Sequence, residues 1–253
     1  MNKYVKNLNL PADCAGIIIS GRYYHIYENK LKSLSIRAFL MPDDPKLPQG
    51  TAHHTDLSVF HADDDQLVIS QSFKGSAFED ELLAEGFEIK HFELKQSAEY
   101  PHDAGGNVCY FGDHAFLNPA SADPAIINCL NEKNAVITAV KQGYTKCNIC
   151  VLDEHSIITN DRVIAEKAEK QGIDALFSDP SAIRLEGYAH GFIGGSAFKI
   201  SDDTLCFTGV LDGFETSEKR KILEFCEKKQ IRPVYLSDLP LFDIGGAVPV
   251  LER

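Results

Sequence analysis

The chain has 253 residues, which is enough for one large domain or two small ones. Hydrophobic residues make up 44% and charged residues 25%, so a disordered, collagen-like or coiled-coil chain is excluded. Acidic residues outnumber basic ones 37 to 25, giving a formal net charge of −12. Because such a field repels phosphate groups, we expect no nucleic-acid partner and no attraction to an anionic membrane surface.

Apolar runs and cysteines indicate the compartment. The longest apolar runs, such as 15–19, are far shorter than the roughly 20 residues that a membrane-spanning helix needs. Residues 1–7 carry charge, but no signal-peptide core follows them. Seven cysteines, an odd number, several of them inside apolar segments, predict reduced thiols in a cytoplasmic protein. Cys147 and Cys150 form a lone Cys-x-x-Cys in what reads as a strand, so we predict no metal and no cofactor.

The most informative feature is an internal repeat. Five short apolar strands each end in a polar or turn residue, and successive strands start 50, 49, 41 and 48 residues apart. They lie at 17–20, 67–70, 116–119, 157–160 and 205–208. Each is followed by a helical pattern, a second apolar strand, a turn and a last strand. We therefore predict a single domain of five units, at approximately 15–65, 66–113, 114–155, 156–203 and 204–253.

The predicted elements follow the same order in every unit. The clearest helix begins at Asn160 or Asp161, which can cap it, and ends at Gly172. The predicted helices are 28–34, 76–85, 124–132, 162–170 and 216–229. The last strands of the units begin near 54, 107, 147, 196 and 247.

Glycine pairs precede the last strand in three units, at 105–106, 194–195 and 245–246. A glycine pair lets the backbone turn tightly or approach a neighbour or ligand closely. An ordinary α/β chain also alternates strands and helices. The near-constant spacing and the recurring glycine pairs favour a cyclic array of five units instead.

Five such units resemble the pentein fold of the guanidino-group-modifying enzymes. That fold is an α/β, five-bladed pseudo-fivefold propeller of ββαβ-type repeats. The resemblance runs from about 15 to 252, and segments 102–107, 144–148 and 157–161 are most similar to an uncharacterised family with this fold. It implies that the turn entering each last strand points at a central axis, where residues from distant units converge.

Enzymes of this fold use a cysteine nucleophile, a histidine acid/base and carboxylates that grip a guanidinium. Asp56 resembles the first-unit aspartate of agmatine deiminases, and Asp103 is the acid nearest their second-unit glutamate position. Two departures stand out. No cysteine follows the last glycine pair, where the family places its nucleophile, and residues 144–147 replace the third-unit His-x-Asp.

Two hypotheses follow from this comparison. In the first, the nucleophile has moved to Cys147, Lys146 or a histidine lowers its pKa, and His54 or His190 transfers the proton. The protein would then hydrolyse or transfer a carbon–nitrogen bond of a small guanidino- or amidine-like cation. The substrate-binding residues in this interpretation are Asp56, Asp103, Asn107, Lys146 and Asp243.

In the second hypothesis, catalysis is lost and the axial pocket only binds a small ligand or a protein partner, as in ribosomal anti-association factors of this fold. Each candidate residue also has a purely structural explanation. A free cysteine such as Cys147 is commonly a small buried hydrophobe. Asp56 and Asp103 can satisfy backbone donors at a strand entry or a turn.

Overall fold

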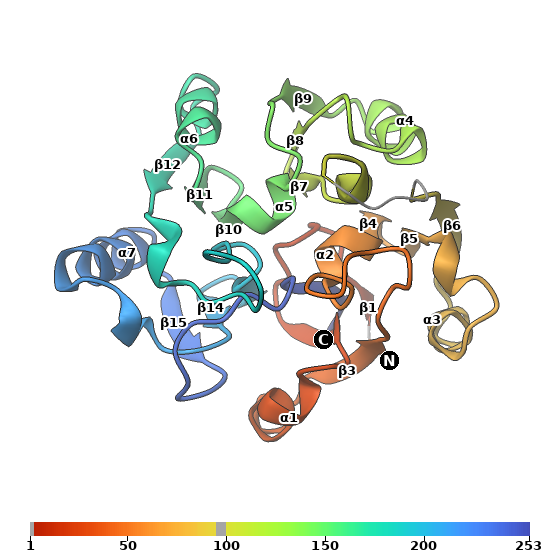
Figure 1. Cartoon of the computed structure of the whole chain (residues 1–253), viewed down its shortest axis with the longest axis horizontal. Coiled ribbons are helices and arrows are strands. Elements are labelled where there is room, and N and C mark those ends of the chain that lie inside the picture. The colour runs from red at the N-terminus through yellow and green to blue at the C-terminus, as the bar shows by residue number, and fades with distance from the viewer. Residues whose placement is uncertain (1–2, 95–99) are drawn as a thin grey trace.

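Five small β-sheets are arranged in a ring around a central axis, with the longer helices on the outer rim (Figure 1). The structure is a computed structural model and describes residues 3–94 and 100–253. Four of the sheets have three strands and the fifth has four. No helix in the described part of the chain is long and apolar enough to cross a membrane.

The four three-stranded sheets are built alike. In each, the first two strands form an antiparallel hairpin, and a helix then leads to a third strand parallel to the second, since a parallel pair needs such a crossover. The first comprises β4 (Val59–Asp63), β5 (Gln66–Ser70), α3 (Ala77–Glu85) and β6 (Glu88–Phe92). The second comprises β7 (Cys109–Phe111), β8 (His114–Leu117), α4 (Pro124–Glu132) and β9 (Val136–Ala139).

The third and fourth sheets repeat this pattern. The third comprises β10 (Ile149–Asp153), β11 (Ser156–Thr159), α6 (Arg162–Glu169) and β12 (Asp174–Phe177). The fourth comprises β13 (Ala197–Ser201), β14 (Thr204–Phe207), α7 (Thr216–Lys228) and β15 (Arg232–Tyr235).

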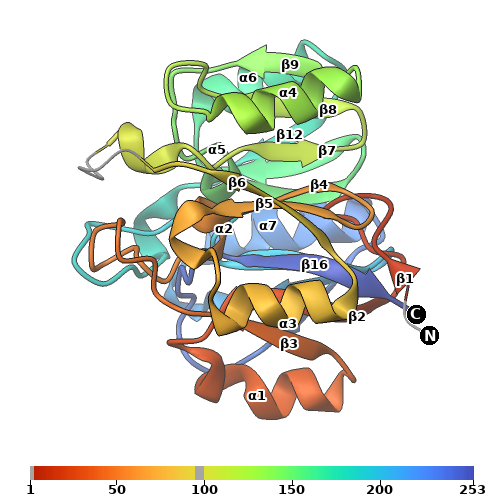
Figure 2. The same ribbon diagram turned by 90° about the vertical axis from the view of Figure 1, so that its right-hand side faces the viewer.

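The remaining sheet closes the ring. Strand β2 (Cys14–Ser20) pairs in parallel with β3 (Arg37–Met41) across α1 (Tyr24–Ser33) and antiparallel with β16 (Ala247–Glu252). A short strand, β1 (Lys3–Tyr4), adds to the other edge of β16, so the two ends of the chain lie side by side (Figure 2). The last strand of each predicted unit thus pairs with the first strand of the next unit.

Apolar side chains fill the space between neighbouring sheets. All seven residues of β2 are buried. Ile18 of β2 belongs to the same cluster as Leu67 of β5 and Phe78 of α3, so this core joins two adjacent sheets and a rim helix. Further clusters join the other neighbours in the same way. The strands that face the axis are therefore held on both sides.

The structure corrects two predicted strand starts. Residues 55–58 and 147–148, expected to open strands, instead lie in one-turn helices, α2 (Thr55–Ser58) and α5 (Thr145–Asn148), next to the axis. In α5 the Asn148 amide donates to the Tyr144 carbonyl at 3.0 Å, as a helical turn requires. The strands begin only at Val59 and Ile149. The residues of these turns are mostly polar, and four residues are too few to show a helical period, so the sequence pattern did not reveal them.

Glycines at the axis allow the segments there to approach closely, as the glycine pairs predicted. A Cβ atom on Gly194 would lie 2.3 Å from the Lys146 carbonyl oxygen and 2.4 Å from that of Ile149. Gly245 has φ +76° and sits against the His54 backbone, where a Cβ atom would lie 2.3 Å from Cα. These contacts press the fourth and fifth units against α5 and α2.

We predict that Gly194→Ala destabilises the protein by about 1–3 kcal/mol, because the added methyl group meets rigid backbone atoms. Denaturant unfolding measures the loss. The matched control is Gly213→Ala, whose Cβ atom would have its nearest contact at 3.6 Å. Equal stability of the two variants would show that the axis has room the structure does not display.

Candidate functional site

A cavity of about 230 Å³ lies at the axis of the ring. Its wall is formed by the two one-turn helices α2 and α5, the segment 185–192 and Asp243, so at least three predicted units contribute. The lining residues are Thr51, His54, Leu57, Tyr144, Cys147, Leu185, Tyr188, Ala189, His190, Phe192 and Asp243.

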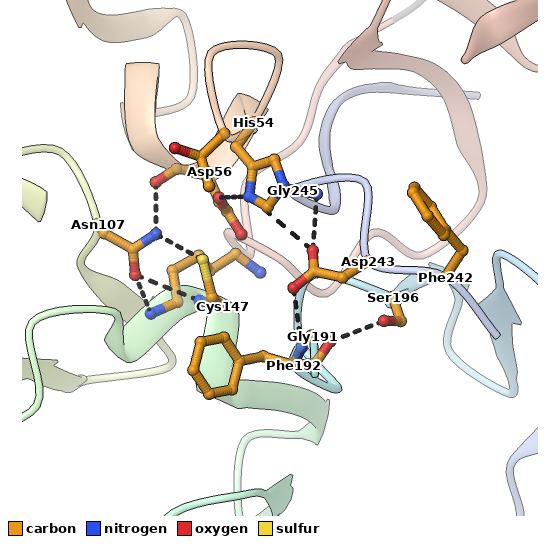
Figure 3. A network of polar contacts seen from close by, with 12 residues as sticks. His54, Asp56, Asn107, Cys147, Gly191, Phe192, Ser196, Phe242, Asp243 and Gly245 are labelled. Carbon is orange, nitrogen blue, oxygen red and sulfur yellow. Dashed lines mark hydrogen bonds and ion pairs between the residues drawn. The ribbon is translucent and has the colours of Figure 1, made fainter. Parts of the chain in front are cut away.

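Asn107 fixes the position of the Cys147 thiol (Figure 3). Its Nδ2 atom donates to Cys147 Sγ at 3.0 Å and to the Asp56 carbonyl oxygen at 2.9 Å. Its Oδ1 atom accepts from the backbone amides of Lys146 at 2.8 Å and Cys147 at 3.2 Å. Both polar atoms of Asn107 are therefore used to hold α5, and the residue acts on the site through Cys147.

Two buried carboxylates lie beside the thiol. Asp243 accepts hydrogen bonds from the backbone amides of Gly245 at 2.9 Å and Phe192 at 2.8 Å. Asp56 is 2% exposed, and neither of its carboxylate oxygens has a hydrogen-bond partner in the described part of the chain. Burial raises the pKa of Asp56 to about 6 and that of Asp243 to about 7. A buried carboxylate without a partner is costly, and Asp56 is such a group.

His54 lies between the two carboxylates. Its Nδ1 atom is 3.8 Å from Asp56 Oδ1 and 3.9 Å from Asp243 Oδ1, too far for a hydrogen bond to either. Burial lowers the pKa of His54 to about 4, so the imidazole is neutral at pH 7 and can accept a proton. The Nε2 atom is also buried and has no partner among the described residues.

The environment of the Cys147 thiol corrects one expectation. We predicted that Lys146 or a histidine lowers its pKa. Instead, burial raises the pKa of the thiol well above its ordinary value, and the charges of Asp56 and Asp243 raise it further. Without a bound cation, Cys147 is therefore a neutral thiol.

The same group of residues could hold a metal ion. One donor atom each from His54, Asp56 and Cys147 lie within 4.8 Å of one another. Nitrogen, oxygen and sulfur donors together suit Zn²⁺. The expectation that the protein uses no metal stays a prediction.

The remaining predicted residues surround this centre at different distances. His190 lies on the cavity wall, where its Nδ1 atom is 3.0 Å from the Gly191 carbonyl oxygen. A positive charge on His190 lowers the pKa of Asp243. The side chain of Lys146 is not part of the wall, although its charge lowers the pKa of Asp56. Asp103, in the 3₁₀ turn η2 (His102–Ala104), accepts a 2.5 Å hydrogen bond from the Tyr144 hydroxyl. Tyr144 lines the cavity and Asp103 does not, so the contact of Asp103 with the cavity is indirect.

Sequence reasoning missed the aromatic part of the wall, Tyr144, Tyr188 and Phe192. Tyr144 directly precedes α5. The position in the repeat that led us to predict Cys147 could therefore also have indicated Tyr144. Tyr188 and Phe192 lie in the connection from β12 to β13, residues 178–196. Long connections of this kind often carry function, and that length was the available signal.

The closed ring of five mixed sheets with a cavity at its axis defines a pentein-fold protein, which confirms the predicted fold and resemblance. The chain belongs to the Family of unknown function (DUF6873), whose model matches residues 18–248.

Solved structures of the pentein fold are similar over most of their length. Inosamine-phosphate amidinotransferase from Streptomyces griseus has a TM-score of 0.61 at 10% identity, covering 98% of this chain and 96% of that one. DDAH from Pseudomonas aeruginosa, in complex with citrulline, has a TM-score of 0.54 at 12% identity, covering 89% and 92%. The C. jejuni agmatine deiminase has a TM-score of 0.53 at 11% identity, covering 94% and 90%. No curated protein matches the sequence. At these identities the likeness establishes the fold alone.

We predict that Asp56→Asn stabilises the ligand-free protein at alkaline pH. The folded-state pKa of about 6 exceeds the unfolded value near 3.9, so wild-type stability falls as the pH rises from about 4 to 7. The Asn side chain does not ionise, so the variant does not lose this stability. Its free energy of unfolding relative to wild type therefore rises by about 1 kcal/mol between pH 5 and pH 8. Urea denaturation at both pH values measures it. An advantage that shrinks with rising pH would mean that the carboxylate is already paired with a cation.

Proposed function

We propose that the protein is a cysteine-dependent hydrolase or transferase that acts on the carbon–nitrogen bond of a small guanidinium or amidinium cation. The observation that carries the proposal is the pair of buried carboxylates, Asp56 and Asp243, beside the Cys147 thiol. A planar cation with N–H donors along its edges would offset one of the two charges and offer donors to the orphaned oxygens of Asp56. Fold neighbours named as an amidinotransferase and an agmatine deiminase support the choice of cation.

Binding of the cation would also activate the thiol. The two carboxylates raise the pKa of Cys147, so a positive charge placed among them offsets that effect and favours the thiolate. The nucleophile therefore forms when the substrate is present. Asn107 keeps the sulfur in place through its 3.0 Å hydrogen bond.

In the chemical step, neutral His54 accepts the thiol proton and Cys147 Sγ forms a bond to the central carbon of the cation. The tetrahedral adduct collapses by breaking a carbon–nitrogen bond, and the leaving nitrogen takes a proton from His54 or from His190 at the wall. With a guanidinium, the amidino group remains on sulfur as a thiouronium, and with an amidinium a thioimidate remains. Attack on that carbon by water completes a hydrolysis, and attack by an amine completes a transfer. Either step breaks the carbon–sulfur bond and returns the Cys147 thiol.

The alternative is a pentein-type binding protein without catalysis. The favouring observation is that the protein's own groups keep Cys147 protonated until a cation arrives. Such a protein would bind the same cations and form no covalent adduct with them.

A charged electrophile and its neutral isostere test the proposal. We expect 2-chloroacetamidine to alkylate Cys147 at least about tenfold faster than 2-chloroacetamide at pH 8, because an ion pair in a buried site contributes more than about 1.4 kcal/mol. Peptide mass spectrometry identifies the modified cysteine. Cys147→Ser should abolish the fast reaction. Cys206→Ser, the matched control with a buried thiol outside the cavity wall, should retain it.

Equal rates for the two reagents would contradict cation recognition. Fast labelling together with slow release of ammonia or amine from guanidines would support catalysis. Fast labelling without any turnover, and without a thiouronium adduct on Cys147, would favour the binding protein.

A further inference from the structure

The cavity is lined by two groups of side chains. We call His54, Cys147 and Asp243 its charged end. The rest of the lining, called its apolar end, is mainly aliphatic and aromatic and comprises Leu57, Leu185, Tyr144, Tyr188 and Phe192. A guest held by its cation at the first end must therefore place the rest of the molecule against the second.

Two polar groups of this lining are already bonded. The Tyr144 hydroxyl donates to Asp103 at 2.5 Å, which leaves the ring itself to line the cavity. The His190 ring bonds to the Gly191 carbonyl at 3.0 Å and packs edge-on against Phe192, with centroids 5.6 Å apart. The Tyr144 and Phe192 rings lie 6.2 Å apart. The wall thus offers ring faces and edges rather than donors and acceptors.

No lysine or arginine belongs to this wall within residues 3–94 and 100–253. Arg22 is paired with Asp43 and donates to the Gln49 carbonyl. Arg184 lines a separate pocket beside Tyr23. A carboxylate on the tail of a guest would therefore have no basic partner in this lining, whereas an apolar tail would gain contact with it.

The wall is equally unsuited to a second positive charge. Apart from Asp243 at the charged end, the described lining contains no acidic residue. Glu186, next to this segment, accepts a 3.5 Å hydrogen bond from Tyr23 and is not part of the wall. The volume of about 230 Å³ exceeds the roughly 150 Å³ of a cavity that binds benzene and falls below the roughly 300 Å³ of drug-sized pockets. The tail must be small.

We infer that the natural ligand is a guanidinium or amidinium with a short, uncharged, apolar tail, and that carboxylate-bearing guanidines such as arginine are excluded. The inference rests on the proposed function, because it assumes that the cation occupies the charged end. The tail that this lining can bind is an alkyl or aryl group of about the size of one ring.

Three guanidines of matched length test the inference: butylguanidine, agmatine and 4-guanidinobutyrate. They share the guanidinium and differ in what ends the chain, a methyl, an ammonium or a carboxylate. Methylguanidine, which has almost no tail, measures the charged end alone. We expect calorimetry on the metal-free protein at pH 8 to give butylguanidine an affinity at least about tenfold above either charged analogue, a difference of about 1.4 kcal/mol.

A variant should reverse this order. Tyr188→Arg places a cation at the apolar end, at a residue that is 47% exposed. Relative to methylguanidine, it should improve the affinity for 4-guanidinobutyrate at least about tenfold, the size of one paired charge. Tyr188→Met is the matched control, because it removes the ring and adds no charge.

The outcomes separate the two proposals. If methylguanidine binds and either charged analogue binds as tightly as butylguanidine, the inference about the tail fails and the proposed function stands. An unchanged ligand order in Tyr188→Arg would also contradict it. If none of the four guanidines binds, the proposed function fails and the inference fails with it.

Discussion

Closure of the ring is the constraint on which the site depends. Pairing of β16 with β2 joins the end of the chain to its beginning and leaves five sheets around one axis. The side chains that meet there are far apart in sequence, from His54 in the first predicted unit to Asp243 in the fifth. Without that pairing, no short stretch of the chain could assemble the group.

The axis concentrates groups that would be unfavourable anywhere else in the core. Two carboxylates, a neutral imidazole and a thiol are buried next to the apolar cores that surround the axis. In the proposed function, a bound cation would offset part of this cost. The same cation would then also change the protonation of the Cys147 thiol.

Much of this architecture could be predicted from the sequence. The spacing of the apolar strands and the glycine pairs predicted the cyclic fold, because both reflect backbone geometry that repeats in each unit. Position in the repeat then brought Cys147, His54 and Asp243 together as candidates, and the structure places all three on one cavity wall.

Other features could not be predicted. The helical turns α2 and α5 are only four residues long, so no helical period distinguishes them from the start of a strand. The direction of the Cys147 pKa shift depends on which charged groups the fold places beside the thiol, and Asp56 and Asp243 come from distant parts of the chain. The aromatic wall comes from an irregular connection, where no periodic pattern exists to be interpreted.

The position of β16 also affects how the chain folds during synthesis. Residues 247–252 leave the ribosome after all four three-stranded sheets, so the wholly buried strand β2 has one unpaired edge until then. An exposed apolar edge is a template for pairing with other chains. A nascent or truncated chain without β16 should therefore depend on chaperones, and β2 gains protection from aggregation only when residues 247–252 pair with it.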